Sequence, residues 1–343
     1  FAVVEDLMQN IFKETKNYTL EDHFVRIPWA ECMRRFGTDK PDMRFGNEIQ
    51  DITAVFENTE FQVFKNTIEN GGIINCVKFE NAADKYSRKG LDQLQDFVKH
   101  GFKAKALAYL KMENDVLTGS IAKVLSEEEK AKLVEKLGLV NNDLVLVIAD
   151  SARIVQASLG ALRVRLGHEL NLIPSKATYK FLWVTDFPMF EYSEEDQRWV
   201  AAHHPFTAPK EEDVDKLFTD PGHVSSRAYD LVLNGYELLS GSIRIHSQEL
   251  QAKVFEAIGL SLEDAKARFG FFLDSFRYGT PPHGGVGIGL ERLIMVLAGT
   301  DNIRDVVAFP TTNSSFDLMS EAPNVVDKKQ LDILGIEISK QEK

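Results

Sequence analysis

The sequence predicts an α+β protein in which an antiparallel sheet flanked by helices carries an inserted α/β unit. Three observations predict this fold class. The chain of 343 residues is longer than a single hydrophobic core usually needs. Strand-like and helix-like segments alternate between residues 71 and 150. From residue 180 onward, long strand-like segments are separated by short helical pieces and Gly/Pro turns, a texture typical of antiparallel sheets.

The first half of the chain predicts helices alternating with short strands. An N-terminal helix would gather apolar side chains on one face, namely Val3, Val4, Leu7, Met8, Ile11 and Phe12. Strands are predicted at 71–79, 106–112 and 143–150, with a helix over 87–101 between the first two. Another helix begins at Ser126, with Glu129 three residues on as a capping box.

Residues 151–172 predict a long helix that turns basic side chains outward, namely Arg153, Arg163, Arg165 and His168. Outward arginines suit an RNA-facing stripe, but a solvated helix face has the same pattern and is commoner. The second half continues with strand-like segments over 180–192, 198–209 and 228–247. Two helices follow within 247–279, the second capped by Ser261 and Asp264.

Composition limits the classes of function. With 40 Lys+Arg against 52 Asp+Glu, the net charge of -12 argues against a protein that coats nucleic acid through bulk charge. No apolar run approaches membrane-spanning length, so no membrane partner is expected. The two cysteines have no metal-binding spacing, which favours a reducing cytoplasm. Because the chain starts at Phe1 without a basic leader, we expect no signal peptide and an excerpt of a longer protein.

The stretch "GGVGIGLERLIMVLAG" at 284–299 raises the question of a nucleotide site. It fails the dinucleotide fingerprint, because its third glycine comes one residue early, and it lacks the Gly-Lys-Ser/Thr of a Walker loop. Glycine at every second position predicts a strand with one bare face, followed by a helix with Arg292 in its first turn. That guanidinium could stack on a base or bind phosphate oxygens, although packing alone also produces such strands.

Two carboxylates on the strand-like segment at 228–247, Asp230 and Glu237, form a plausible Mg²⁺ pair. Beyond them Ser242, Arg244 and His246 share one face. Asp230 to Glu237 and Glu237 to Arg244 are both seven-residue steps, so a shared pocket requires one irregularity near Gly235 and another near Ser240-Gly241. An amphipathic strand with solvated polar residues is the plain alternative.

The adjacent histidines of "HHPFTAP", His203 and His204, cannot both face one way in a regular strand. At most one of them is therefore expected to reach a ligand there. Zinc is disfavoured, because no partnering Cys or His stands at ligand spacing.

Together these segments resemble the bacterial-type aspartyl-tRNA synthetases, which are class II synthetases. The resemblance covers essentially the whole chain in the same order, and it is carried by "FGTDKPDMRF", "WVTDFPMFEY", "HHPFTAPK", "AYDLVLNGYELLSGSIRIHS", "FRYGTPPHGGVGIGLERL" and "GTDNIRDVVAFP". The "GVGIGLERL" stretch is similar to the third class II signature motif, which implies an ATP site on an antiparallel sheet. The resemblance implies a class II catalytic domain over 1–54 and 170–343, with an inserted GAD-type domain at 55–169.

Carried over residue by residue, the resemblance implies that His203 and Arg244 bind the L-aspartate substrate, with His204 beside them. Glu237 would bind ATP and its Mg²⁺, assisted by Asp230. Ser240 falls where the archaeal and eukaryotic pattern has a serine that joins the metal shell. Further ATP contacts would come from the third motif, namely Gly289, Leu290, Glu291 and Arg292, and the catalytic roles would fall to Arg292 and Glu237.

The implied activity is aspartate–tRNA ligation: formation of aspartyl-adenylate from aspartate and ATP, then transfer to tRNA-Asp, with tRNA-Asn as a further acceptor left open. The family's anticodon-binding domain, first two signature motifs and flipping loop have no counterpart in these residues, so we expect a fragment with little adenylation activity from a protein that is a homodimer at full length. Two alternatives stay open, a related synthetase such as the asparaginyl enzyme and a non-catalytic paralogue that binds tRNA or a protein.

Overall fold

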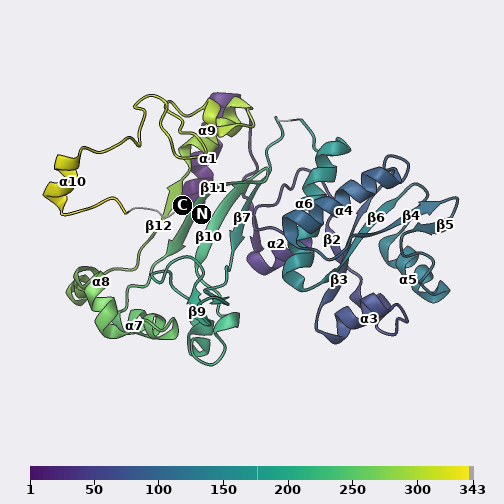
Figure 1. Ribbon diagram of the computed structural model, residues 1–343, viewed down its shortest axis with the longest axis horizontal. Helices are drawn as coiled ribbons and strands as arrows, with labels where there is room; N and C mark the ends of the chain where they lie inside the picture. Colours follow the sequence, from purple (N-terminus) through teal and green to yellow (C-terminus); the bar gives the residue numbers. More distant parts are fainter. Residues whose placement is uncertain (176, 340–343) are drawn as a thin grey trace. The chain divides into compact units, whose positions relative to one another are not determined.

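The computed structural model describes residues 1–175 and 177–339. The described residues divide into two compact units, one up to Gly289 and one from Leu290 onward. The first unit contains two five-stranded sheets (Figure 1). The fold is therefore α+β, as the sequence predicts. No helix in the described part of the chain is both long enough and apolar enough to span a bilayer.

The first sheet carries the predicted polar residues. Its strand order is β1-β7-β10-β11-β12, where the strands are β1 (Val25–Pro28), β7 (Phe181–Thr185), β10 (Ala228–Leu233), β11 (Tyr236–Ile243) and β12 (Gly284–Ile288). β1 pairs with β7 in parallel, and all other neighbours pair antiparallel, which confirms the prediction of a largely antiparallel sheet. A separate hairpin is formed by β8 (Phe190–Ser193) and β9 (Arg198–Ala201).

Helices cover both faces of this sheet. α2 (Trp29–Phe36) packs on the face that contains Leu182, Val184, Ala228 and Val232. α1 (Ala2–Lys16) is tied to the other face, because the indole N–H of Trp183 donates to Glu5 at 2.9 Å. On α1, Met8 and Phe12 are buried, whereas Val3 of the predicted apolar face is 83% exposed.

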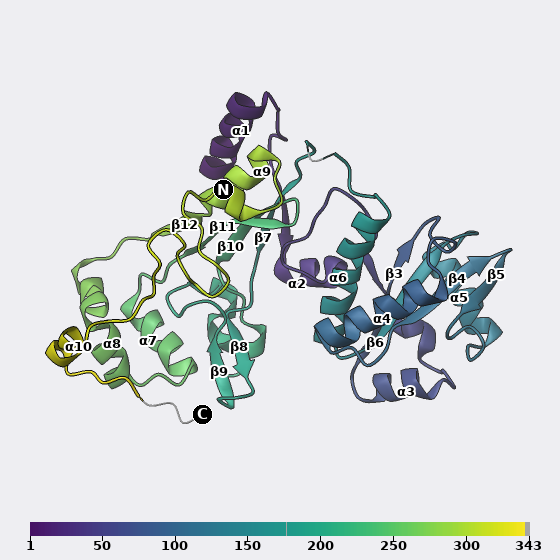
Figure 2. The ribbon, with the colours of Figure 1, turned by 45° about the horizontal axis from the view of Figure 1, so that its top comes forward.

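Two further helices, α7 (Gln248–Ala257) and α8 (Leu262–Ser275), pack on each other (Figure 2). The predicted cap of α8 is confirmed, since the Ser261 hydroxyl accepts from the backbone N–H of Asp264 at 3.0 Å. Short 3₁₀ segments lie at η1 (Thr53–Phe56), η2 (Glu211–Lys216), η3 (Pro221–His223) and η4 (Phe276–Tyr278).

The second sheet has the order β2-β3-β6-β4-β5, with β2 (Ile49–Asp51), β3 (Ile73–Phe79), β4 (Ala108–Glu113), β5 (Val116–Gly119) and β6 (Leu144–Asp150). The three strands predicted in this region are confirmed. Every neighbouring pair is antiparallel, so the alternation of helix and strand does not produce a parallel sheet. The domain boundaries at 54/55 and 169/170 stay a prediction.

β6 is buried on both faces because helices cover both sides of this sheet. Leu144, Leu146 and Ile148 pack under α4 (Arg88–Phe102) and α6 (Ala152–Glu169). Val145 and Val147 pack under α3 (Gln62–Glu69) and α5 (Glu127–Leu137). The predicted capping box of α5 is confirmed: the Ser126 hydroxyl accepts from Glu129 N–H, and the Glu129 carboxylate accepts from Ser126 N–H.

The prediction that α6 turns its arginines outward is wrong for Arg163, which is fully buried. Its guanidinium donates to four backbone carbonyls of the loop between α2 and β2 at 2.8–3.1 Å, namely those of Asp42, Phe45, Gly46 and Asn47. Arg153 and His168 are exposed and Arg165 is half-buried. Side-chain periodicity could not reveal Arg163's role, because its partners lie more than a hundred residues away in the sequence.

The second unit contains α9 (Leu290–Ala298), η5 (Ile303–Asp305) and α10 (Lys328–Leu334). α9 begins two residues after β12 ends, which confirms the predicted strand followed by a helix with Arg292 in its first turn.

Candidate functional site

A hairpin brings the two predicted carboxylates together. Asn234 and Gly235 both have positive φ, 53° and 88°, as a two-residue type I′ turn requires. The turn makes β10 and β11 neighbouring antiparallel strands, so Asp230 and Glu237 do not lie on one strand as predicted. The predicted irregularity near Gly235 exists, and it is the turn itself.

A bulge sets the direction of Glu237. Leu231 pairs with Leu239, but Val232 pairs with Glu237, which leaves Leu238 as an extra residue on β11. Asp230 pairs with Ser240, so the bulge puts Glu237 on the same face as Asp230 and Ser240. The second predicted irregularity therefore lies at Leu238 rather than at Ser240-Gly241.

Asp230 is held in an environment that disfavours its charged form. Its side chain is buried, and burial raises its pKa to about 6, with the charge of Glu237 and of Asp39 acting in the same direction. A hydrogen bond with Ser240 opposes that shift. A buried carboxylate with a raised pKa beside a second carboxylate is typical of a site that binds a cation.

Glu237 is only partly buried and faces a lysine that sequence reasoning missed. Lys40 Nζ lies 3.2 Å from Glu237 Oε2. Lys40 belongs to the "GTDKPDMR" loop, whose sequence carries charges and a proline but no spacing that points to β11. The packing of α2 on the Asp230 face of the sheet helps to bring this loop to the hairpin.

The second predicted cluster is a contact between His204 and Arg244. Arg244 Nη1 lies 2.6 Å from His204 Nε2. Burial lowers the pKa of His204, and the positive charges of Arg244 and His203 lower it further. His204 is therefore neutral at pH 7 and has one ring nitrogen that can accept from the guanidinium, which can only donate; Nδ1, which accepts from the backbone N–H of Phe206, also lies 3.2 Å from Arg244 Nη1. The backbone of Arg244 pairs with that of Thr207 in an isolated antiparallel β-bridge.

His203 takes a different direction from His204. Its ring packs edge-on against Phe187, with the ring centres 5.4 Å apart, and its charge acts on Asp230. The two histidine side chains thus contact different residues, as expected for adjacent residues of an extended segment. That only one of them reaches a ligand stays a prediction.

β12 supplies the bare strand face predicted from its glycines. Gly285 and Gly287 pair with Ser242 and Ser240, so they lie on the Asp230 face. A β-carbon on Gly285 would meet nothing within 4 Å, and one on Gly287 would meet only Ser240 O at 4.0 Å. The sheet therefore has an open, flat surface beside the carboxylates, where a planar ligand could lie.

Gly289 ends the first unit, and its N–H donates to Leu238 O at 2.8 Å. The other predicted ATP contacts, Leu290, Glu291 and Arg292, begin α9 in the second unit. The contacts within the first unit therefore define a site with four parts. They are the β10–β11 hairpin, the loop that carries Lys40, the segment with His203 and His204, and β12.

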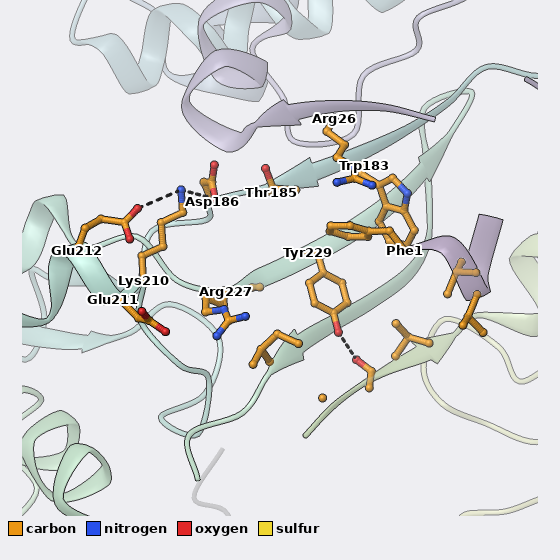
Figure 3. Close-up of a pocket in the computed structure, with 17 residues that line it drawn as sticks. Phe1, Arg26, Trp183, Thr185, Asp186, Lys210, Glu211, Glu212, Arg227 and Tyr229 are labelled. Atoms are coloured by element: carbon orange, nitrogen blue, oxygen red, sulfur yellow. Dashed lines mark hydrogen bonds and ion pairs between the residues drawn. The ribbon is translucent and has the colours of Figure 1, made fainter. Parts of the chain in front are cut away.

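A large pocket in the first unit lies away from these residues. It encloses about 960 Å³ on the opposite face of the same sheet, where Figure 3 shows Trp183 and Tyr229 beside Phe1. Trp183 and Tyr229 alternate with Val184 and Asp230 along their strands and so point away from the carboxylates. None of the predicted site residues lines it, so pocket size does not locate the chemistry of this protein.

The carboxylate cluster suits Mg²⁺ better than a softer metal. Within residues 1–175 and 177–339, no three His, Cys, Asp or Glu side chains are grouped to hold a metal on their own. Mg²⁺ is commonly held by one or two carboxylates together with waters and substrate phosphates. Asp230 and Glu237, with the Ser240 hydroxyl, match that donor set.

Comparison with known proteins assigns the class. The family model of class II tRNA synthetases (D, K and N) matches residues 1–313, and the chain belongs to this family.

Among its relatives, the aspartate–tRNA ligase of Listeria welshimeri is 49% identical over 341 residues, and that of Staphylococcus carnosus is 47% identical over 334 residues. These matches cover 99% and 97% of this chain but only 57% and 56% of the relatives, so the chain spans little more than half their length. The solved aspartyl-tRNA synthetase of Entamoeba histolytica, 18% identical, covers 91% of this chain and 58% of that one with a TM-score of 0.32, and the fold described above does not depend on it.

Proposed function

We propose that the protein carrying this chain is an aspartate–tRNA ligase, which activates L-aspartate with ATP and transfers it to the 3′-end of tRNA-Asp. The observation that carries the proposal is the Arg244–His204 contact near the Asp230–Glu237 hairpin, because it offers a carboxylate-binding cation and a cation-binding acidic pair in one unit. The similarity to curated aspartate–tRNA ligases supports the choice of substrates.

Arg244 is the proposed ligand of the aspartate side chain. A guanidinium can hold a carboxylate with two parallel hydrogen bonds. His204 accepts from Nη1 and so fixes the direction of the guanidinium, and His203 is proposed to contact the substrate nearby. An asparagine side chain would turn an amide donor toward this donor, which disfavours the asparaginyl alternative.

Glu237, Asp230 and Ser240 are the proposed holders of Mg²⁺ bound to ATP. The metal would neutralise phosphate charge, and its own charge would offset the cost of burying the ionised Asp230 carboxylate. Gly289, Leu290, Glu291 and Arg292 are proposed to contact ATP, with Arg292 near the adenine and terminal phosphate.

In the proposed reaction, the α-carboxylate of aspartate attacks the α-phosphorus of ATP and pyrophosphate leaves. The 3′-terminal hydroxyl of tRNA then attacks the carbonyl carbon of aspartyl-adenylate and AMP leaves. The residues of this chain would bind and orient the two substrates, without a covalent enzyme intermediate. We further propose a homodimer and a cytoplasmic location, where two buried free cysteines would stay reduced.

The experiment that tests the proposal is aspartate-dependent exchange between ATP and pyrophosphate, on a sample whose intact mass has been measured. In a protein of the relatives' full length we expect exchange with aspartate and Mg²⁺, and none with asparagine in place of aspartate; with this chain alone we expect little exchange. Exchange that depends on asparagine would assign the related synthetase instead. If a protein of the relatives' full length binds tRNA without any exchange, it is a non-catalytic paralogue.

A further inference from the structure

The loop between α2 and β2 carries Lys40, Asp42 and Arg44, and the proposed function assigns no role to any of these three side chains. We propose that this loop is part of the nucleotide site and that Lys40 is a ligand of the ATP phosphates, held on Glu237 until Mg²⁺ and ATP bind. The inference rests on the proposed function, because it assigns ATP to the Glu237 site.

Three contacts place the loop at the carboxylates. The Lys40 ammonium lies 3.2 Å from Glu237 Oε2. The loop also packs on the hairpin turn, since a β-carbon on Gly235 would lie 3.6 Å from the Asp42 β-carbon and 3.9 Å from the Lys40 carbonyl oxygen. The helix before the loop, α2, packs on the Asp230 face of the sheet. Lys40 is thus on the face where Mg²⁺ and ATP are proposed to bind.

The backbone of the loop is fixed by α6. Arg163 donates to four of its carbonyls, and Arg163 lies against the rings of Phe36 and Phe45 at 5.1 and 4.0 Å. At the start of the loop, helix and loop touch backbone to backbone, because a β-carbon on Gly160 would lie 2.7 Å from Phe36 O. Loop geometry is therefore set by the helix that follows the second sheet.

Within this fixed loop, Lys40 is the cationic side chain that is available to a phosphate, because Arg44 is paired with Asp42. Asp42 is engaged by Arg44, whose Nη2 lies 2.7 Å from Asp42 Oδ2. Lys40 is 44% exposed, and its partner Glu237 is 25% exposed. An ion pair so open to solvent is weak, so the ammonium can leave the carboxylate at little cost.

In the proposed exchange, Lys40 leaves Glu237 for the ATP phosphates, and each charged group keeps a partner of opposite charge. Without metal, Lys40 balances one carboxylate of the Asp230–Glu237 pair. When Mg²⁺ takes Glu237 as a ligand, the ammonium loses that partner and gains the phosphate oxygens that arrive with the metal. Lysine suits this role, since its ammonium is a compact charge on a flexible stem that binds phosphate without fixed geometry.

The test is the variant Lys40→Met in a protein of natural length, with two affinities measured. Binding of Mn²⁺ alone, followed by electron paramagnetic resonance, should tighten by about two- to fivefold, because a competing cation is removed from Glu237. Binding of ATP with Mg²⁺, followed by calorimetry, should weaken by about tenfold or more, because a charged phosphate contact is lost. A general loss of structure would not move the two affinities in opposite directions.

Two further variants complete the experiment. Lys40→Arg should keep most of the ATP affinity, and Lys65→Met, which removes an exposed lysine on α3, should change neither affinity. Unchanged or tighter ATP binding by Lys40→Met, or weaker Mn²⁺ binding, overturns the role of Lys40. If the wild-type protein fails to bind ATP at all, the proposed function itself fails, so the two failures are distinguishable.

Discussion

The buried carboxylate of Asp230 lowers the free energy of unfolding, and the substitution Asp230→Asn measures by how much. Burial raises the pKa of Asp230 to about 6 from an ordinary value of 3.8, so the folded protein resists its ionisation at neutral pH. Asparagine has nearly the same shape, can still hydrogen-bond Ser240 and carries no charge. We therefore expect the variant to be more stable than the wild type at pH 7.5 in the absence of metal.

The magnitude follows from linkage. The rise of the pKa from 3.8 to about 6 lowers the free energy of unfolding by about 3 kcal/mol at pH values above 6. At those pH values the carboxylate is charged in both the folded and the unfolded state. Below pH 3.8 it is protonated in both states and the difference disappears. The stability of the wild type should thus fall relative to Asp230→Asn as pH rises from about 4 to about 6, and the gap should then stay constant at about 1–3 kcal/mol.

The assay is urea unfolding followed by tryptophan fluorescence, in EDTA, at several pH values between 4 and 7.5. Asp213→Asn is the control, because Asp213 is as little exposed to solvent as Asp230 but has a lysine partner. Burial alone would raise the pKa of Asp213, but Lys216 at 2.6 Å and the backbone N–H of Ser225 lower it. Asp213→Asn should therefore destabilise at pH 7.5 by about 1–3 kcal/mol, the opposite sign.

Two results would refute this account of Asp230. One is a variant less stable than the wild type at pH 7.5, which would mean that the charged form makes contacts worth more than its burial costs. The other is a gap that does not change between pH 4 and pH 7, which would mean that the stability effect is unrelated to ionisation.

Two other predictions concern Arg244 and α6. Arg244→Gln should raise the KM for aspartate roughly 100-fold in the exchange assay, because the charge pair with the substrate is lost. Arg268→Gln on the exposed face of α8 should leave the KM unchanged. Equal effects of the two variants would remove Arg244 from the aspartate site. Gly160→Ala should destabilise by about 1–3 kcal/mol, because its new β-carbon meets a backbone oxygen at 2.7 Å. Gly101→Ala, also helical but with nothing within 4 Å, should leave stability unchanged or raise it by up to about 1 kcal/mol in thermal unfolding, and a similar loss in both variants would contradict the steric reason.

Local features were readable from the sequence because their partners are a few residues apart. The capping box at Ser126 and the buried strand at 144–150 are of this kind. The Asn234-Gly235 pair also carried a strong turn signal, and reading it would have separated Asp230 from Glu237 into two strands.

Features set by distant packing could not be read in this way. The bulge at Leu238 depends on its pairing with β10, and the alternation of β11 alone does not reveal it. Arg163 is polar and lies in a helix whose other arginines are exposed or half-buried, so its burial is explained by the backbone carbonyls to which it donates. Lys40 was missed for the same reason. Its partner Glu237 lies on the face of the sheet on which α2 packs, and this proximity cannot be read from the sequence.

The parallel pairing of β1 with β7 also has a consequence for how the chain folds. Val25 pairs with Leu182, and the whole of the second sheet lies between them in the sequence. Closing so long a loop from a disordered chain is entropically unfavourable and slow. If the second sheet folds first, α6 docks on α2, which directly follows β1, and the two strand ends are already close. The intervening segment would then act as a folding template, and the order of events during synthesis would favour it, because residues 25–169 leave the ribosome before β7 does.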